Sequence, residues 1–332
     1  TDSIDVPMTA TISGTGSPPY IKFKWELPDE DLTKPETQIY PALSSQRNMY
    51  AYVVAGDPQG RDQIAAIYVD IFHPVDVYPW CGSFKFQVHD CVKLDPISDQ
   101  SEIIDAIDDA VAAGLITGPR SAVGTEAWEI YEEIYNWEEA YMWRCTWPMS
   151  YHQPCGWYTV KAWGVDNIGE RTSEADKLTN QFEFVCVQAA DIDFPSINFG
   201  VITPSIEQIV HGDWDMTTYD HPTIKNEGNM ELAIGLHATP LFGPPGPQQK
   251  TIIDFDAKFW GFNPDTQSWS DQKLYFKASD HPWFDKDHIL PLCNTTKISF
   301  SVHAPFGTPN DVYSGTMTLY IDGGFYSDNY CE

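Results

Sequence analysis

Apolar and polar residues alternate along several short segments of the chain, as they do in β-strands that bury one face. In YIKFKWEL the alternation places Ile21, Phe23 and Trp25 on one face of a predicted strand. Residues 49–74 predict two apolar strands on either side of the turn DPQG at 57–60, where proline presets φ and glycine closes the turn. The N-terminal part of the chain is therefore expected to be a small β unit.

The period of the pattern changes between residues 98 and 142. In DQSEIIDAIDDAVAAGL the apolar residues recur at helical spacing, Asp99 and Glu102 resemble a capping box, and Gly114 predicts the end of the helix. A second helix is predicted over 125–141. We therefore expect a two-helix insertion in an otherwise β chain.

Strand patterns occupy the rest of the sequence. The segment PTIKNEGNMELAIGLHA (222–238) predicts a hairpin, because Asn and Gly in its turn, 226–229, tolerate positive φ. Other strands are predicted for GSFKFQVHD, GWYTVKAWGVDNIGE, NQFEFVCVQ, IDFPSINFGVI, KTIIDFDAKFWGF, KISFSVHA and SGTMTLYID.

Many short strands with turn signals and few helices are typical of β-sandwiches. The predicted fold is mainly β, with tandem immunoglobulin-like β-sandwich units and the two-helix insertion. The predicted units are 1–74, 75–188 and 189–332. The second carries the helices, and its continuity with the first is left open.

Composition and charge argue against nucleic acid and against the membrane interior as partners of the chain. The chain has 48 acidic and 19 basic residues and a net charge of −29, which argues against nucleic acid because phosphate binding needs clustered Lys and Arg. No run of about 18 apolar residues occurs, so no membrane span is predicted. The sequence starts at Thr1 rather than Met, from which we expect a processed N-terminus.

Seven cysteines are widely and irregularly spaced and form no CxxC pair: Cys81, Cys91, Cys145, Cys155, Cys186, Cys293 and Cys331. This spacing favours disulfides in an oxidising, extracellular setting over a zinc or redox motif. The odd number leaves at least one thiol unpaired or bonded to another chain.

Strand geometry restricts the disulfide pairings. Cys81 and Cys91 bracket a predicted strand and would lie about 33 Å apart, too far for a bond. A bond between Cys145 and Cys155 is feasible across a proline-containing loop, and Cys186 is a partner for Cys91 or Cys81. Cys293 and Cys331 belong to the last unit, and the terminal Cys331 is the first candidate for an intermolecular bond.

Several segments resemble known families of surface proteins. KWELPDED, YVVAGDPQG and YVDIFHP resemble a PKD-type immunoglobulin-like domain, and INFGVITPS with KNEGNMELAIGL and SGTMTLYI resembles the immunoglobulin-like repeat of many surface proteins. YHQPCGWYTVKAWGVDNIGE and ILPLC, in the same order, resemble envelope proteins of methanogenic archaea that form sheaths or surface layers. The resemblance implies a structural role without catalytic residues.

Two groups of side chains on the second helix are candidate sites. Its glutamates could supply a glycosidase pair, but no second acidic segment faces them, and a solvated face is the preferred interpretation: Glu126, Glu129, Glu132, Glu133, Glu138 and Glu139. Core packing is the preferred interpretation for any single aromatic residue of this helix, but their number exceeds what one buried stripe needs. They are therefore also candidates for an interface or a sugar-stacking platform: Trp128, Tyr131, Tyr135, Trp137 and Tyr141.

Other residues that could bind ligands give weaker signals. His281 and His288 flank PWFDKD, but their spacing matches no metal motif, and no metal or cofactor is predicted. Weak calcium binding by grouped loop aspartates stays an open alternative. Asn294 begins an N-glycosylation sequon.

The sequence thus predicts a non-enzymatic, extracellular structural subunit at the cell surface. It would assemble with itself into a sheath, surface layer or filament through strand edges and disulfides, with cell-wall glycans as a further candidate partner. The alternative is a carbohydrate-binding or adhesion module that uses exposed Trp and Tyr, and a secreted hydrolase ranks third.

Overall fold

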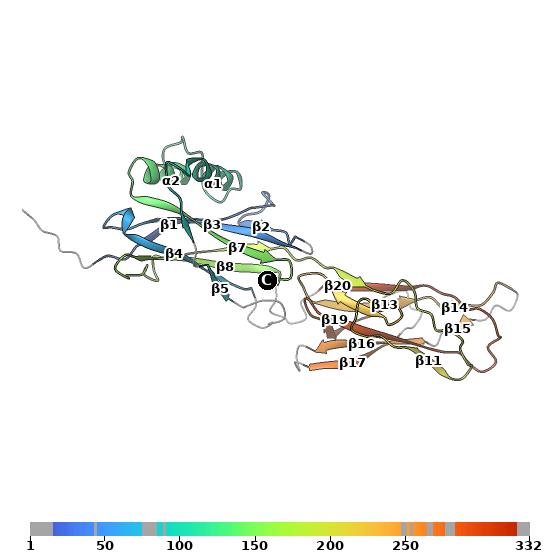
Figure 1. Ribbon diagram of the computed structural model, residues 1–332. Helices are drawn as coiled ribbons and strands as arrows, with labels where there is room; N and C mark the ends of the chain where they lie inside the picture. Colours follow the sequence, from blue (N-terminus) through green and yellow to red (C-terminus); the bar gives the residue numbers. More distant parts are fainter. Residues whose placement is uncertain are drawn as a thin grey trace, which may run out of the picture.

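The computed structural model describes residues 16–42, 45–74, 85–88, 91–246, 251–252, 255–263, 268–275 and 283–323. The fold is mainly β, and the described helices are α1, α2 and the short 3-10 helix η1 (Arg61–Gln63). Figure 1 shows two β units placed end to end, with both α-helices on the N-terminal one.

The N-terminal unit is a sandwich of two sheets. The first has the strand order β1 (Tyr20–Leu27), β3 (Gln46–Gly56), β7 (Ala140–Ser150), β6 (Val92–Lys93). The second has the order β2 (Thr37–Ile39), β9 (Leu178–Phe184), β8 (Gly156–Asp166), β4 (Ile64–Phe72), β5 (Lys85–Val88). Both sheets combine strands from the predicted units 1–74 and 75–188, so these two stretches fold together as one sandwich.

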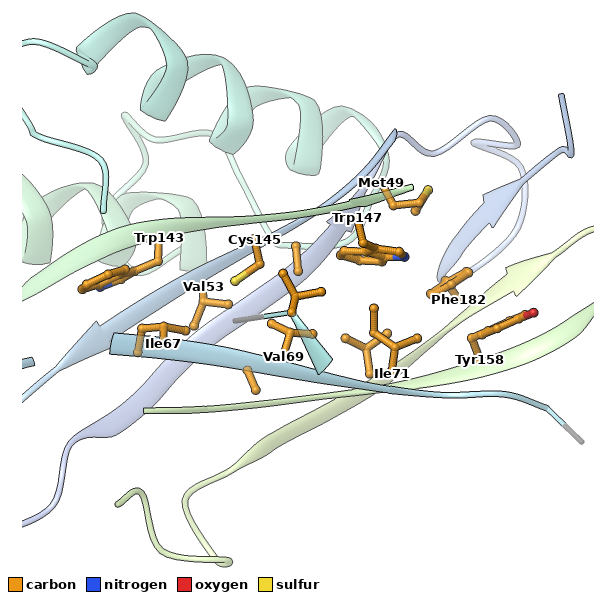
Figure 2. Packing of buried hydrophobic residues seen from close by; sticks show 14 of the residues in the cluster. Met49, Val53, Ile67, Val69, Ile71, Trp143, Cys145, Trp147, Tyr158 and Phe182 are labelled. Atoms are coloured by element: carbon orange, nitrogen blue, oxygen red, sulfur yellow. The ribbon is translucent and has the colours of Figure 1, made fainter. Parts of the chain in front are cut away.

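A core of alternate side chains fills the space between these sheets (Figure 2). Val53 on β3 and Val69 on β4 are fully buried in it. The rings of Tyr158 and Phe182 stack with centroids 5.0 Å apart. The Tyr158 hydroxyl donates to the Pro154 carbonyl at 2.7 Å, so the polar end of this buried ring is paired.

The helices α1 (Gln100–Ala112) and α2 (Glu126–Tyr135) cover the outer face of the first sheet (Figure 1). Their apolar stripes form a second core with that face, which includes Trp25, Val54, Ile103, Ile107, Ile130 and Met142. The predicted stop at Gly114 is confirmed: its φ is 74° and its N–H donates to the Val111 carbonyl. No helix in the described part of the chain is long and apolar enough to cross a membrane.

Two details of the helix prediction are wrong. The Asp99 side chain caps no helical N–H, because its Oδ2 accepts from the Asp95 N–H at 2.8 Å instead. The second helix ends at Tyr135 rather than at 141, because β7 starts at Ala140 and its 11 residues pair with β3. Sheet pairing therefore overrides the helical pattern of residues 136–141.

The C-terminal unit is built on one strongly curved sheet. Its strand order is β10 (Ala190–Ile192), β12 (Thr223–Asn226), β19 (Thr295–His303), β16 (Phe255–Asn263), β18 (Trp283–Leu290), β13 (Leu232–Ala238), β20 (Met317–Gly323). β11 (Glu207–Val210) pairs with β19 and β17 (Ser268–Tyr275) with β16, while β14 (Leu241–Phe242) and β15 (Thr251–Ile252) form a separate ribbon. The sheet encloses a core that includes Phe194, Ile224, Leu232, Ile234, Phe259, Leu290 and Phe300.

The predicted hairpin at 222–238 is wrong although both of its strands exist. β12 and β13 flank 226–229 but do not pair, since β12 bonds to β10 and β19 whereas β13 bonds to β18 and β20. The predicted turn at 57–60 and the strands on either side of it are confirmed: the Gly60 N–H donates to the Asp57 carbonyl, and the turn leads from β3 in one sheet to β4 in the other. The predicted strand IDFPSINFGVI is wrong beyond Ile192, where β10 ends.

The turn at 226–229 has another role, because it holds the two units together. The Asn229 side chain accepts from the Val187 N–H at 2.7 Å and donates to the Val185 carbonyl at 2.9 Å. The backbone carbonyl of Asn229 accepts from the Cys155 N–H at 2.9 Å. A Cβ at Gly228 would lie 2.4 Å from the Val187 carbonyl oxygen, so only glycine permits this approach.

Candidate functional site

Two disulfides are defined within the described residues, and their pairing corrects the predicted one. Cys91 bonds to Cys145, tying β7 to the residue before β6 and enclosing both helices in the loop. Cys155 bonds to Cys186 rather than to Cys145, since β9 lies beside β8 and not beside β5. The predicted 145–155 bond and the predicted pairing of Cys186 with Cys91 or Cys81 are therefore wrong.

The Cys155–Cys186 disulfide lies at the junction of the units. Both residues belong to the core of the C-terminal unit, while β8 and β9 beside them belong to the N-terminal sandwich. Cys293 is disulfide-bonded as well, and the two cysteines that remain as its partner, Cys81 and Cys331, lie outside the described residues. An intermolecular bond through Cys331 stays a prediction.

The five aromatic interface candidates contact one another and nearby cations of their own chain. Trp128 and Trp137 meet edge to face with centroids 5.8 Å apart, and Tyr131 and Tyr135 lie 4.7 Å apart. Tyr141 belongs to β7 and lies 4.4 Å from both Arg61 and Lys93. Trp137 is 46% exposed, which makes it the candidate most open to a partner.

The glutamates of α2 do not all form a solvated face. Glu133 is 1% exposed, and both it and Glu129 form ion pairs with Lys22 of β1. Burial lowers the pKa of Lys22, but hydrogen bonds to the two carboxylates outweigh it and raise the pKa above its ordinary value. Sequence reasoning missed Lys22, and its position among apolar residues of a strand was the available signal.

The edge strand β1 carries charges that point into the sandwich. A β-bulge between Ile21 and Phe23 turns Ile21 toward the inter-sheet core, while Phe23 faces the helices. The predicted common face is thus wrong for Ile21. The register that follows places Lys24 and Glu26 on the inner side, opposite the face of Trp25.

Lys24 and Glu26 form a buried ion pair. Lys24 Nζ lies 2.6 Å from Glu26 Oε1, and each side chain is 1% exposed. Glu26 Oε2 accepts from Asn180 Nδ2 of β9 in the opposite sheet at 2.5 Å. Burial raises the pKa of Glu26 and lowers that of Lys24, although each is opposed by the attraction of its partner. Inward charges of this kind discourage an edge strand from pairing with another chain.

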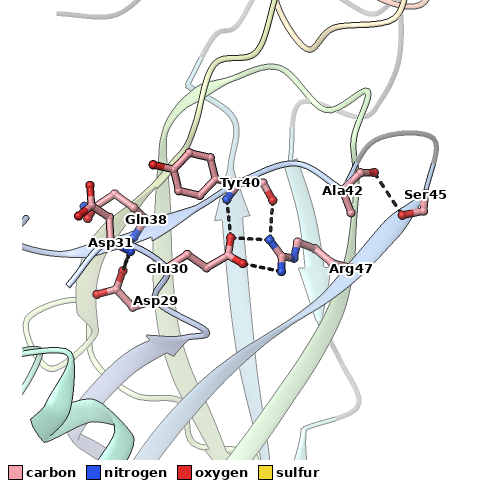
Figure 3. Close-up of polar contacts among 8 residues, drawn as sticks. All are labelled: Asp29, Glu30, Asp31, Gln38, Tyr40, Ala42, Ser45 and Arg47. Atoms are coloured by element: carbon pink, nitrogen blue, oxygen red, sulfur yellow. Dashed lines mark hydrogen bonds and ion pairs between the residues drawn. The ribbon is translucent and has the colours of Figure 1, made fainter. Parts of the chain in front are cut away.

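A polar cluster fixes the loop after β1 (Figure 3). The Arg47 guanidinium of β3 binds both carboxylate oxygens of Glu30 and also donates to the Tyr40 carbonyl at 2.6 Å. Next to it, a cleft of about 650 Å³ lies between the first sheet and α1, with Arg47, Tyr50, Tyr52 and Asp109 in its wall. The cluster orders the loop and leaves the cleft as a candidate ligand site.

The edge strand β20 lacks the protection that β1 has. Among the described residues it pairs only with β13, and its other edge has no strand partner. Met317, Leu319 and Ile321 point inward and are only half-buried. Outward lie Thr318 and Tyr320, the latter 39% exposed. No inward-facing residue of this strand is charged.

The remaining sequence candidates give no assembled site. No group of three His, Cys, Asp or Glu side chains that could hold a metal occurs within the described residues. His288 contacts Ser270 through Nε2 at 2.8 Å, whereas His281 lies outside the described residues. Asn294 is half-buried and donates to the Leu292 carbonyl, so glycosylation there stays a prediction.

Comparison with known proteins gives little further information. No family model matches the chain, and no curated protein matches it. Among solved structures, the C-terminal domain of the Streptococcus pyogenes antigen I/II-family protein AspA aligns over 92% of this chain and 96% of its own. The identity is 13% and the TM-score is 0.23, which is too low to support an inference about fold or function.

Proposed function

We propose that the protein is a non-enzymatic, extracellular structural subunit that assembles with itself into a cell-surface sheath, surface layer or filament. The observation that carries this proposal is the edge of β20 that no strand of the described residues covers, together with its half-buried apolar side chains. An open apolar edge is a template for pairing with another chain, and monomeric proteins normally block such edges.

The distribution of exposed apolar side chains supports the same proposal. Of the seventeen large apolar residues that are exposed in the described part of the chain, ten lie between Ile192 and Tyr320, including Val201 at 96% and Phe306 at 91%. Contiguous apolar surface is typical of interaction sites, and this unit carries more than half of the exposed large apolar residues from which such a surface could form. The C-terminal unit is therefore the main assembly surface in this proposal.

The disulfides support an extracellular location. Two bonds are defined and a third involves Cys293, and such bonds persist in oxidising environments. The tandem immunoglobulin-like organisation, the two-helix insertion and the kinship with archaeal envelope proteins belong to this proposal and rest on the sequence resemblance.

Sedimentation velocity and negative-stain electron microscopy of the oxidised full chain test the proposal. We expect ordered polymers whose formation rises with salt, because the net charge of −29 opposes association and added ions screen it. A chain that stays monomeric from low to near-molar salt and over a wide concentration range would refute it.

A carbohydrate-binding or adhesion role is the second candidate. Trp137 and Trp214 are 46% and 50% exposed, and exposed indole rings are suitable for stacking on sugars. A glycan array with the wild type and with Trp137→Ala and Trp214→Ala chains separates the roles. The carbohydrate-binding role would be favoured if the wild type binds glycans and does not polymerise, and if either substitution abolishes the glycan binding.

A further inference from the structure

The open side of the C-terminal unit contains an apolar groove. Its volume is about 340 Å³, and it lies between β20 and the segment that follows β10. Most of its walls are apolar and include Phe194, Ile197, Phe199, Leu241, Phe300, Met317 and Leu319. Asp256 and the hydroxyl residues Ser196, Thr239, Ser301 and Thr316 line it as well. The inward side chains of β20 are only half-buried because no strand covers this side of the core within the described residues.

The sequence before residue 16 contains a strand pattern that matches such a groove. Residues 4–12 read IDVPMTATI, with apolar residues at every second position: Ile4, Val6, Met8, Ala10 and Ile12. The intervening positions are polar or proline, as expected for a strand that buries one face. Nine residues extend over about 27 Å, enough to run along the whole of β20.

We infer that residues 4–12 of one copy of the chain add as a β-strand to the free edge of β20 in a second copy, with the apolar side chains in the groove. This inference rests on the proposed self-assembly and specifies its contact. Pro7 is compatible with it, because it falls between the inward positions. A residue at that position can direct its missing N–H away from β20, as in a strand that pairs on one side only.

The length of the chain excludes insertion into its own groove. Tyr20 pairs with Gly56 at the far end of the first sheet, whereas Ser150 lies at the end next to the junction. The ten residue steps of β7 from Ala140 to Ser150 separate these ends by about 33 Å. Ile12 precedes Tyr20 by eight residues and so lies at most about 28 Å from it. Ile12 therefore cannot reach even the junction, whereas β19 and β20, which line the groove, belong to the unit beyond it (Figure 1).

The contact is heterologous, which determines the type of assembly. The donor strand belongs to one end of the subunit and the groove to the other. Repetition of such a contact gives a ring if the rotation closes and an open filament if it does not. The end-to-end arrangement of the units in Figure 1 favours a linear polymer.

Charge substitutions on matched positions test the donor strand. Ile12→Asp places a carboxylate in the groove, whereas Thr11→Asp adds the same charge on the opposite face. We expect the first to raise the critical concentration for assembly at least about tenfold, because an unpaired carboxylate is costly to bury. The second should change it about twofold or less, since it adds a surface charge. Equal assembly of wild type and Ile12→Asp would overturn strand addition and leave the proposed function standing.

The acceptor side is tested on β20 in the same way. Leu319→Asp should abolish assembly, while Thr318→Asp, which faces solvent, should not. A mixture of Ile12→Asp and Leu319→Asp subunits retains one intact groove and one intact donor strand, and should stop at one-to-one dimers in sedimentation velocity. If Leu319→Asp fails to fold, the donor variants alone decide, because residue 12 lies outside the described cores. Polymers from the mixture would overturn the inference.

A peptide separates this inference from the proposed function. A fluorescent peptide of residues 1–15 should bind the Ile12→Asp chain in an anisotropy titration, and the same peptide with Ile12→Asp should not. Binding of the peptide to a wild-type chain that never polymerises would show that the groove accepts this strand, but it would refute both the proposed assembly and strand addition between copies. Absence of binding, together with polymerisation of the wild type, would overturn strand addition alone.

Discussion

The buried pair of Lys24 and Glu26 predicts a destabilisation that depends on pH. Lys24→Met removes the cation and leaves Glu26, which is 1% exposed, with Asn180 as its remaining polar partner. Breaking a buried ion pair from one side typically costs about 3–5 kcal/mol. The cost is limited by protonation of Glu26, since each unit of pKa shift corresponds to about 1.4 kcal/mol.

The sign of the pH dependence follows from the direction of the Glu26 pKa. Burial raises that pKa in the folded state, and without Lys24 nothing of opposite charge counters it. Stability of the variant should therefore be fully present below the ordinary glutamate pKa and decline as the pH rises toward the folded pKa. Lys24→Met with Glu26→Gln should recover most of the loss at neutral pH, because no buried charge remains.

Hydrogen exchange of the β3 amides measures the opening free energy of the N-terminal unit without interference from the other unit. Lys34→Met is the matched control, because Lys34 is 48% exposed and pairs with Glu183 at 3.6 Å. We expect this control to change stability by about 0.5 kcal/mol or less. A Lys24→Met effect of the same size as the control, or one that is constant between pH 4 and 8, would refute the reasoning.

Three further predictions concern other positions. Burial lowers the pKa of His73 to about 4, so an NMR titration of its ring should show that value. The stability that the neutral ring contributes should be lost as the pH falls from about 6.5 through 4. A titration near 6.5 would contradict this prediction. Replacing both Cys155 and Cys186 by Ser should lower the free energy of unfolding by about 3–4 kcal/mol, given a sequence separation of 31 residues. An unchanged urea midpoint would show that the junction does not need this bond. Gly228→Ala should lower the melting temperature by several degrees, because the added Cβ would lie 2.4 Å from the Val187 carbonyl oxygen. An unchanged melting temperature would show that the segment around Val187 can move to accommodate the methyl group.

The sequence predicted the existence of most strands better than their partners. Alternation determines which side chains share a face, but it does not identify the neighbouring strand. The turn at 226–229 therefore suggested a hairpin, although the strands β12 and β13 on either side of it do not pair with each other. Ile21 is the clearest residue that was assigned to the wrong face of its strand. A β-bulge adds one residue to the strand, and the alternation of apolar and polar residues does not reveal it.

The candidate sites show the same limit. The list of cysteines was available from the sequence, but the pairing of Cys155 with Cys186 depends on β8 and β9 being neighbours. The ion pair of Lys22 with Glu133 joins residues 111 positions apart, and no local pattern indicates it. The aromatic pattern continued past Tyr135 although the helix did not, because pairing with β3 determined the structure of the next segment.

The contrast between the two edge strands gives the proposed polymer a direction. β1 has an inward ion pair, and opening its edge to another strand would disturb a contact with β9 in the opposite sheet. β20 has inward apolar side chains that are incompletely covered, and an added strand would bury more of them. Pairing with a strand of another chain would therefore destabilise the edge at β1 and stabilise the edge at β20. Because the alternating segment 4–12 precedes β1, each subunit would offer its strand at one end and its groove at the other. Growth at a net charge of −29 per subunit then requires this apolar contact to exceed the repulsion between neighbours, which is why salt should lower the critical concentration.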